Sequence, residues 1–142
     1  MAYNRYNEST HWFIDSIGMN EGFLPSVSSY PVYKRGDIVF AQLGENIGHE
    51  KCDQRPVMVI SNNTINIHGT NILVAVLTKA SNYTDSATGK VTLYRSQKLM
   101  RKSKYPFLKF DSIVQFEQTR VISKARIDFV AGVLTTDEMK LF

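Results

Sequence analysis

The stretch GDIVFAQLGENIGHEKCDQRPVMVIS, residues 36–61, decides the fold of this chain. It contains two apolar runs of the kind found in β-strands, at 38–41 and 57–60, on either side of a polar loop over 44–54. Gly36 and Asp37 immediately precede the first run. The stretch therefore predicts two buried strands connected by a polar loop.

The rest of the chain also contains short apolar runs separated by turns. A third strand is expected at 72–77 and a fourth at 91–94. Residues 113–116 and 120–122 give a fifth strand, or two short ones. A connection rich in turn-forming residues covers 62–69. Five or more short strands spaced by turns predict a mainly β domain built as a small antiparallel sheet or barrel.

Residues 1–32 differ in character from the remainder of the chain, because they are rich in Asn, Ser and Tyr. Ser9 is placed to cap a short helix that Gly18 would end. Three apolar side chains fall on roughly one face of this helix: Trp12, Phe13 and Ile17. The Gly, Pro and Ser residues over 20–31 predict a linker. The segment is either a loosely attached appendage or a helix docked on the core or on a partner.

The chain of 142 residues fits one domain, which we place at 33–142 after an N-terminal extension over 1–32. The sequence Thr135-Thr136-Asp137-Glu138 is typical of the cap and first turn of a short C-terminal helix. The single cysteine, Cys52, excludes an intrachain disulfide framework and favours a reducing cytoplasm. The N-terminus has no signal-peptide pattern, and no aliphatic run is long enough to span a bilayer.

The charge of the chain points to a polyanion as partner. The formal net charge is +4, and the segment from Lys90 to Lys109 holds seven basic residues and no acidic one. Aromatic residues are interleaved with these cations at Tyr94, Tyr105 and Phe107. Cations pair with phosphates and aromatic faces stack on unpaired bases, so this mixture suits single-stranded nucleic acid. The alternative is a basic loop that only contacts solvent.

Two residues at strand ends could act on such a partner. Arg55 precedes Pro56, which disfavours a helical backbone at Arg55 and holds it extended beside a strand. A guanidinium in that place could clamp a phosphate, although a surface arginine is the simpler interpretation. Thr78 ends the third strand, where its hydroxyl could donate to a phosphate oxygen, although threonine is common at strand ends.

Other kinds of active site find no support in the sequence. The histidines His11, His49 and His68 are scattered without the spacing of metal ligands, so no metal site is expected. No nucleophile elbow, phosphate-binding loop or dinucleotide fingerprint is present, so no cofactor is expected either.

Three blocks of sequence together resemble one protein family, the MazF/PemK toxins of toxin–antitoxin systems. The blocks cover roughly residues 33–134, and their order and spacing carry the resemblance. They are Arg35-Gly36-Asp37-Ile38-Val39 with Gly48-x-Glu50-x-x-x-x-Arg55-Pro56-Val57-x-Val59-Ile60-Ser61-Asn62; Val74-Ala75-Val76-Leu77-Thr78; and Asp111-Ser112-x-x-x-x-Glu117-Gln118-x-Arg120-x-Ile122-x-Lys124-x-Arg126-Ile127.

The resemblance implies a compact SH3-like barrel of the CcdB/PemK type, usually a homodimer, in the cytoplasm. It implies a metal-independent endoribonuclease that cuts single-stranded RNA at short sequences and leaves a 2′,3′-cyclic phosphate and a 5′-hydroxyl end. Arg55 would be the catalytic arginine and Thr78 its partner hydroxyl. A cognate acidic antitoxin would be the regulatory partner.

The remaining expected site residues are contacts to RNA. The resemblance implies the contacts in the loop before Arg55 and the glutamine of the late strand motif. The other contacts are expected from their positive charge, either just after the third strand or in the basic segment. They are Glu50, Lys51, Gln54, Lys79, Arg95, Arg101, Lys102, Lys104 and Gln118.

The chain also departs from the family pattern. The loop usually carries a serine after its first glycine and one or two glycines before Arg-Pro, but here His49, Cys52 and Asp53 hold those places. The altered loop leaves open a barrel that has lost cleavage and only binds RNA or an antitoxin. A toxin directed at DNA gyrase is a third interpretation, which the retained Arg55 and Thr78 disfavour.

Overall fold

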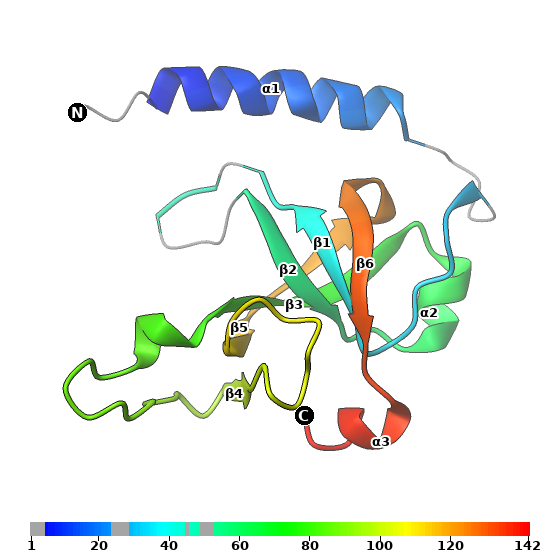
Figure 1. The fold of residues 1–142 in the computed structure, drawn as a ribbon. Helices are drawn as coiled ribbons and strands as arrows, with labels where there is room; N and C mark the ends of the chain where they lie inside the picture. The colour runs from blue at the N-terminus through cyan, green and yellow to red at the C-terminus, as the bar shows by residue number, and fades with distance from the viewer. Residues whose placement is uncertain (1–4, 24–28, 45, 49–52) are drawn as a thin grey trace.

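The computed structural model describes residues 5–23, 29–44, 46–48 and 53–142, and it is mainly β (Figure 1). Six strands form the body of the molecule: β1 (Asp37–Gln42), β2 (Gln54–Val59), β3 (Asn71–Lys79), β4 (Gln97–Met100), β5 (Ser112–Ser123) and β6 (Ile127–Val133). The α-helices are α1 (Arg5–Glu21), α2 (Asn63–His68) and α3 (Thr136–Met139), and two 3₁₀ turns are η2 (Ala80–Tyr83) and η3 (Lys124–Arg126). No helix in the described ranges is long and apolar enough to cross a membrane.

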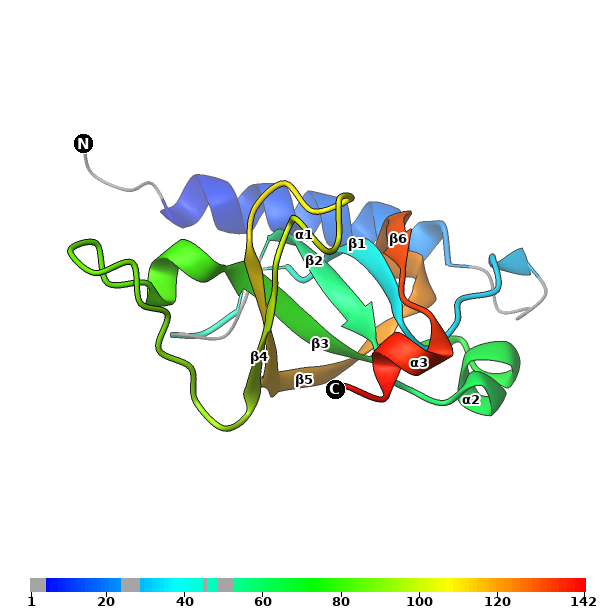
Figure 2. The same ribbon diagram turned by 60° about the horizontal axis from the view of Figure 1, so that its bottom comes forward.

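The strands form one curved antiparallel sheet in the order β4-β5-β3-β2-β1-β6 (Figures 1 and 2). The mainly β class predicted from the sequence is confirmed. The sheet is not closed into a barrel, because β4 and β6 are its two edges and pair only with β5 and β1 in the described part of the chain.

The central strands are buried on both faces. One cluster of buried side chains contains Val57, Val59 and Val76, and a second, on the opposite face, contains Met58 and Leu77. Successive side chains of a strand point to opposite faces, so alternate residues enter alternate clusters. This explains why the strands appear in the sequence as continuous apolar runs rather than as an apolar–polar alternation.

The expected strand at 91–94 is wrong. Val91 makes only an isolated bridge with Thr84, and the strand that pairs with β5 is β4, a few residues further on. A turn precedes β4, in which the Gln97 side-chain carbonyl accepts a hydrogen bond from Tyr94 N–H at 3.1 Å. Of the apolar residues before the turn, Val91 and Leu93 are half-buried, and Tyr94 is 68% exposed.

Other expected elements are confirmed in part. The fifth strand is a single strand, β5, and the sequence analysis did not identify β6. The connection at 62–69 contains the short helix α2, whose N-cap Asn62 accepts a hydrogen bond from Ile65 N–H. The expected C-terminal helix is α3, where Thr135 and Glu138 form a capping box.

The N-terminal helix is longer than expected. It begins before Ser9, so that residue does not cap it, and it continues through Gly18 to Glu21. A glycine inside a helix costs only about 1 kcal/mol relative to alanine. The extra turn carries Met19, which lines a hollow of about 450 Å³ between the helix and residues 123–126.

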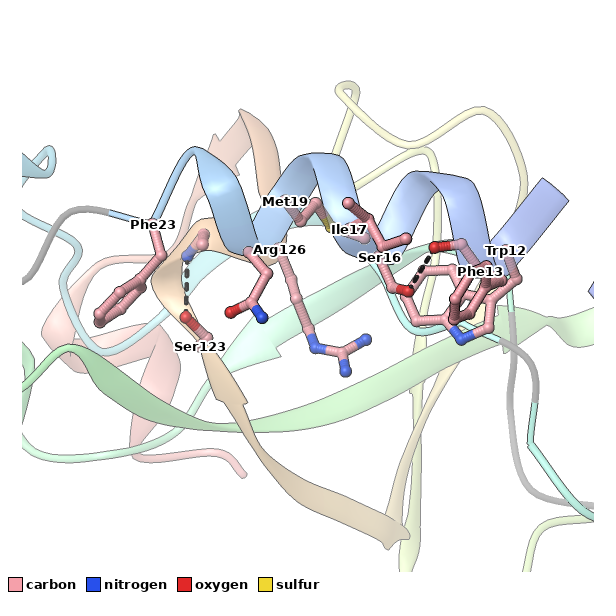
Figure 3. A pocket seen from close by; sticks show the side chains of 10 residues that line it. Trp12, Phe13, Ser16, Ile17, Met19, Phe23, Ser123 and Arg126 are labelled. Atoms are coloured by element: carbon pink, nitrogen blue, oxygen red, sulfur yellow. Dashed lines mark hydrogen bonds between the residues drawn. The ribbon is translucent and has the colours of Figure 1, made fainter. Parts of the chain in front are cut away.

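Helix α1 lies beside η3, at the connection between β5 and β6 (Figure 3). The Arg126 guanidinium lies 5.3 Å from the centre of the Trp12 ring. It donates a 3.0 Å hydrogen bond to the Gln42 carbonyl at the end of β1. The same ring covers Gly44, where an added Cβ would lie 2.4 Å from it. Burial, and secondarily the charge of Arg120, lowers the pKa of Arg126. Of the two arrangements considered for the extension, the structure has the docked helix.

A buried lysine connects α2 to η3. Lys124 is 2% exposed, and its Nζ donates a 2.6 Å hydrogen bond to the Asn66 carbonyl. Burial lowers its pKa, because the charged ammonium loses hydration. The side chain of Asn66 in turn bonds to Ser61, so this group of polar residues is satisfied inside the protein.

We expect Trp12→Ala to destabilise the protein because it removes the ring that covers Arg126 and Gly44. The expected loss is about 1–3 kcal/mol, below the cost in a fully buried site because Trp12 is only half-buried. Urea unfolding measures it. Ile14→Ala, at a position that is 60% exposed on the same helix, is the matched control and should change stability by less than about 0.5 kcal/mol. Equal small effects of both changes would mean that α1 contributes nothing to the stability of the core.

Candidate active site

The pairing of β2 with β3 brings the two predicted catalytic residues together. The ladder reaches Val57 opposite Val76. Arg55 lies two residues before Val57, and Thr78 lies two residues after Val76. When the same register is continued, Arg55 and Thr78 are opposite each other. Side chains at opposite positions of an antiparallel pair lie on the same face. The sheet therefore presents the guanidinium and the hydroxyl on one surface.

At this end of the two strands lies a cleft of about 620 Å³, which we call the β2–β3 cleft. Arg55 and Thr78 both line it. Its walls come from the connection between β4 and β5 and from β6, and its base from β1 and β3. The lining residues are Ile38, Phe40, Gln54, Arg55, Pro56, Leu77, Thr78, Lys79, Phe107, Leu108, Lys109, Phe110, Ser112, Phe129, Val130 and Ala131.

The charge of the cleft suits an anion. Three cations line it, Arg55, Lys79 and Lys109, and none of the described residues that line it is Asp or Glu. Lys79 Nζ lies 4.3 Å from the centre of the Phe110 ring, a cation–π contact that helps to place the ammonium at the rim. An anionic group inside the cleft would therefore meet positive charge without a competing carboxylate from its lining.

Aromatic rings form much of the remaining surface. Phe107 and Phe110 lie on one side, and Phe129 on the other stacks on Phe40 with ring centres 4.8 Å apart. Phe110 and Phe129 are 50% and 52% exposed. Exposed rings beside cations provide stacking surfaces for unpaired bases.

Two polar residues that the sequence analysis missed support the site. Asn82 Nδ2 donates a 3.2 Å hydrogen bond to Thr78 Oγ1, and Thr78 itself is 5% exposed. Asp128 Oδ2 accepts from the amides of Gln54, at 2.7 Å, and Gln42, at 2.9 Å. Asp128 therefore fixes the predicted RNA contact Gln54 at the start of β2.

The remaining predicted contacts divide into three groups. Lys79 and Gln54 line the cleft. Glu50 and Lys51 lie outside the described residues. The others do not line the cleft: Arg95, Arg101, Lys102, Lys104 and Gln118. Lys109, which does line it, stood in the basic segment but was not among the predicted contacts.

Part of the basic segment is engaged within the protein. Arg101 forms an ion pair with Asp111 at 3.1 Å, and Lys102 N–H donates to the same carboxylate. These bonds, led by that from the Lys102 N–H, lower the pKa of Asp111. Lys104 lies 5.5 Å from the centre of the Tyr105 ring. Arg101 and Lys104 line a separate hollow of about 260 Å³ with Lys98.

One departure from the family pattern preserves backbone geometry. Asp53 has φ of 62°, in the left-handed region that favours glycine and that Asp and Asn tolerate better than other residues. Its N–H donates to the Gly44 carbonyl at 2.8 Å, and its carbonyl accepts from the Leu43 N–H at 2.9 Å. These two bonds continue the pairing of β1 with β2. His49 and Cys52 lie outside the described residues. Within the described ranges, no group of three or more His, Cys, Asp and Glu side chains could hold a metal ion.

Sequence comparison places these features in a known class of proteins. The family model of the PemK-like, MazF-like toxins of type II toxin–antitoxin systems matches residues 34–141. The protein belongs to this family, and the prediction from the sequence motifs is confirmed. Helix α1 lies outside the matched residues.

Individual relatives agree with this assignment. An endoribonuclease MazF of Staphylococcus saprophyticus subsp. saprophyticus is 32% identical over 107 residues, which are 75% of this chain and 82% of the relative. An endoribonuclease MazF of Staphylococcus epidermidis is 32% identical over 106 residues, covering 75% and 81%.

Solved structures share the fold. The crystal structure of MazF from Deinococcus radiodurans has a TM-score of 0.58 at 16% identity, covering 78% of this chain and 88% of that one. An endoribonuclease from Mycobacterial species, in complex with its cognate antitoxin, has a TM-score of 0.54 at 18% identity, covering 76% and 84%. At such low identity, these two structures support the fold alone.

Proposed function

We propose that this protein is the toxin of a type II toxin–antitoxin system and acts as a metal-independent endoribonuclease on single-stranded RNA. The observation that carries the proposal is the placement of Arg55 opposite Thr78 in a cleft lined by cations and aromatic rings. The identity to two endoribonucleases supports the type of activity. The substrate of such an enzyme places its action in the cytoplasm.

The proposed reaction uses a nucleophile that belongs to the RNA. The ribose 2′-oxygen attacks the adjacent phosphorus, the bond from phosphorus to the 5′-oxygen breaks, and the proton of the 2′-hydroxyl is balanced by one gained at the 5′-oxygen. The products are a 2′,3′-cyclic phosphate and a 5′-hydroxyl end. This step needs no metal if the protein stabilises the charge that develops on the phosphorane.

Arg55 and Thr78 have the chemistry to do so. The Arg55 guanidinium carries positive charge and a planar set of N–H donors, so its role is that of a charge stabiliser and a donor to the phosphate or the leaving oxygen. The Thr78 hydroxyl donates to a non-bridging oxygen and keeps the phosphate in place. Groups held by paired strands need little reorganisation during the reaction, which is the condition for effective electrostatic catalysis.

The second candidate function is a module that only binds RNA or an antitoxin. The altered loop with His49, Cys52 and Asp53 favours it. The geometry at Asp53, where the backbone keeps a conformation that glycine would adopt, weakens that argument. We therefore favour the nuclease.

We also propose a homodimer, with residues 33–142 as the toxin domain and 1–32 as its extension. Apolar side chains are exposed along the edge strand β6 and beyond it, with Val130 45%, Val133 60% and Leu141 61% exposed. An apolar edge strand of this kind favours association with another chain.

The first prediction from the proposed function is that cleavage of a long RNA persists in excess chelator and depends on both predicted catalytic residues. Arg55→Ala should lower the rate at least about 10²-fold, the usual effect of removing a group that stabilises the transition state. Thr78→Ala should lower it by at least about tenfold. Mapping of the RNA ends should find a cyclic phosphate and a 5′-hydroxyl.

Arg35→Ala is the matched control, because Arg35 is exposed and lies outside the cleft. It should cleave at the wild-type rate. Full activity in a well-folded Arg55→Ala variant, or loss of cleavage on chelation, would contradict the proposed function.

The second prediction concerns the basic segment, whose contribution we expect to be electrostatic. Affinity should be measured with 2′-O-methyl RNA, which lacks the nucleophile. Replacing Arg101, Lys102 and Lys104 together by Gln should weaken binding and reduce the slope of log affinity against log salt, by about 0.7 for each phosphate that the variant no longer neutralises. Lys109→Gln tests the cleft in the same way, with Arg35→Gln as control. An unchanged slope in the triple variant would mean that those three residues do not contact the RNA.

The third prediction concerns regulation by an antitoxin, a partner found in one structural neighbour. We expect a small protein encoded beside this one to present an acidic, disordered tail that orders itself across the cleft. Charge attraction should make association fast and sensitive to salt. Co-expression should relieve growth inhibition and yield a complex on size-exclusion chromatography. Failure of both would exclude this partner and leave the nuclease proposal standing.

A further inference from the structure

The hydrogen bond between Asn82 and Thr78 determines which way the threonine hydroxyl can act. A hydroxyl has one proton to donate and two lone pairs that accept. Asn82 Nδ2 donates to Thr78 Oγ1 at 3.2 Å and so occupies one lone pair. Within the described ranges, no protein acceptor is bonded to the Thr78 proton. The proton therefore remains available to a ligand in the cleft.

We propose that Asn82 is a positioning residue for the reaction, which orients the Thr78 hydroxyl so that its proton points to the scissile phosphate. The proposal rests on the function proposed above, because it needs Thr78 to contact the substrate. A hydroxyl that accepts one hydrogen bond becomes a stronger donor in the next, so the same contact also strengthens the bond to the phosphate. Asn82 itself does not need to touch the RNA.

The turn that carries Asn82 is fixed at both ends. At its start, Ala80 N–H bonds to the Asp111 carbonyl at 2.8 Å. At its end, the Tyr83 hydroxyl accepts from Gln115 Nε2 at 2.8 Å, and the Tyr83 carbonyl accepts from Thr92 N–H at 3.0 Å. η2 is thus attached to β5 and to the loop that comes after η2. The backbone that carries Asn82 is therefore fixed before any ligand arrives.

The type of side chain at position 82 matters, because an amide nitrogen is a neutral donor. A carboxylate at the same place would accept from the Thr78 hydroxyl instead, and the proton would then point away from the cleft. The alternative is that Asn82 has a structural role alone and only stabilises the turn. Asn82 is exposed, however, so a purely structural role predicts a small change in stability and no change in the cleavage rate of the folded protein.

The experiment measures single-turnover cleavage of a short RNA at saturating enzyme, together with affinity for its 2′-O-methyl analogue. Asn82→Ala should slow cleavage about 3- to 10-fold, the usual range for one hydrogen bond, with little change in affinity. Asn82→Asp should slow it further. Ser81→Asp adds the same charge one residue earlier on the turn, at a position outside the cleft, and should slow cleavage much less.

A double-mutant cycle identifies the route of the effect. If Asn82 acts through Thr78, Asn82→Ala should cause no further loss in a Thr78→Ala background. An equal loss in both backgrounds, or no loss in either, would overturn the inference. Unfolding midpoints of all variants establish that the rates compare folded proteins. Full activity of Thr78→Ala would instead contradict the proposed function itself, so the two failures are distinguishable.

Discussion

The pairing of β2 with β3 is the interaction on which the rest of the structure depends. The two strands lie at the centre of the sheet, and their apolar residues are buried on both faces. A slip of the register would draw Arg55 toward the core, where an unpaired guanidinium costs several kcal/mol. Core packing therefore fixes the point at which the polar ends of the strands emerge. Arg55 and Thr78 are placed opposite each other as a consequence.

The same double burial explains which elements could be predicted from the sequence. The runs at 38–41, 57–60 and 72–77 are apolar without interruption, and each became a strand. The run at 91–94 has suitable residues, but in the described part of the chain its strand pairing is limited to the single bridge from Val91 to Thr84. In β4, by contrast, the buried Gln97 amide donates a 2.6 Å hydrogen bond to Glu117 on β5. No local sequence pattern reveals this bond. Tertiary pairing, not strand propensity, decided between these two segments.

In the candidate site, too, local motifs identify some residues, and tertiary contacts bring in others. Arg55 and Thr78 could be proposed as site residues from the sequence because each belongs to a motif of fixed spacing. Asp128 was not, because it meets Gln54 across 74 positions of sequence. Asn82 lies only four residues after Thr78, and a turn directly after the strand was the signal that could have suggested it. Groups that orient the reacting residues depend on the folded geometry, so they escape a search for motifs.

η3 and the start of β6 hold the β1–β2 pair with charges of both signs. Arg126 donates to the Gln42 carbonyl, and Asp128 accepts from the side chains of Gln42 and Gln54. The first contact lies beside Trp12 of α1, whose ring centre is 5.3 Å from the Arg126 guanidinium. The helix outside the family's common region thus supports β1, the strand that pairs with the one carrying Arg55.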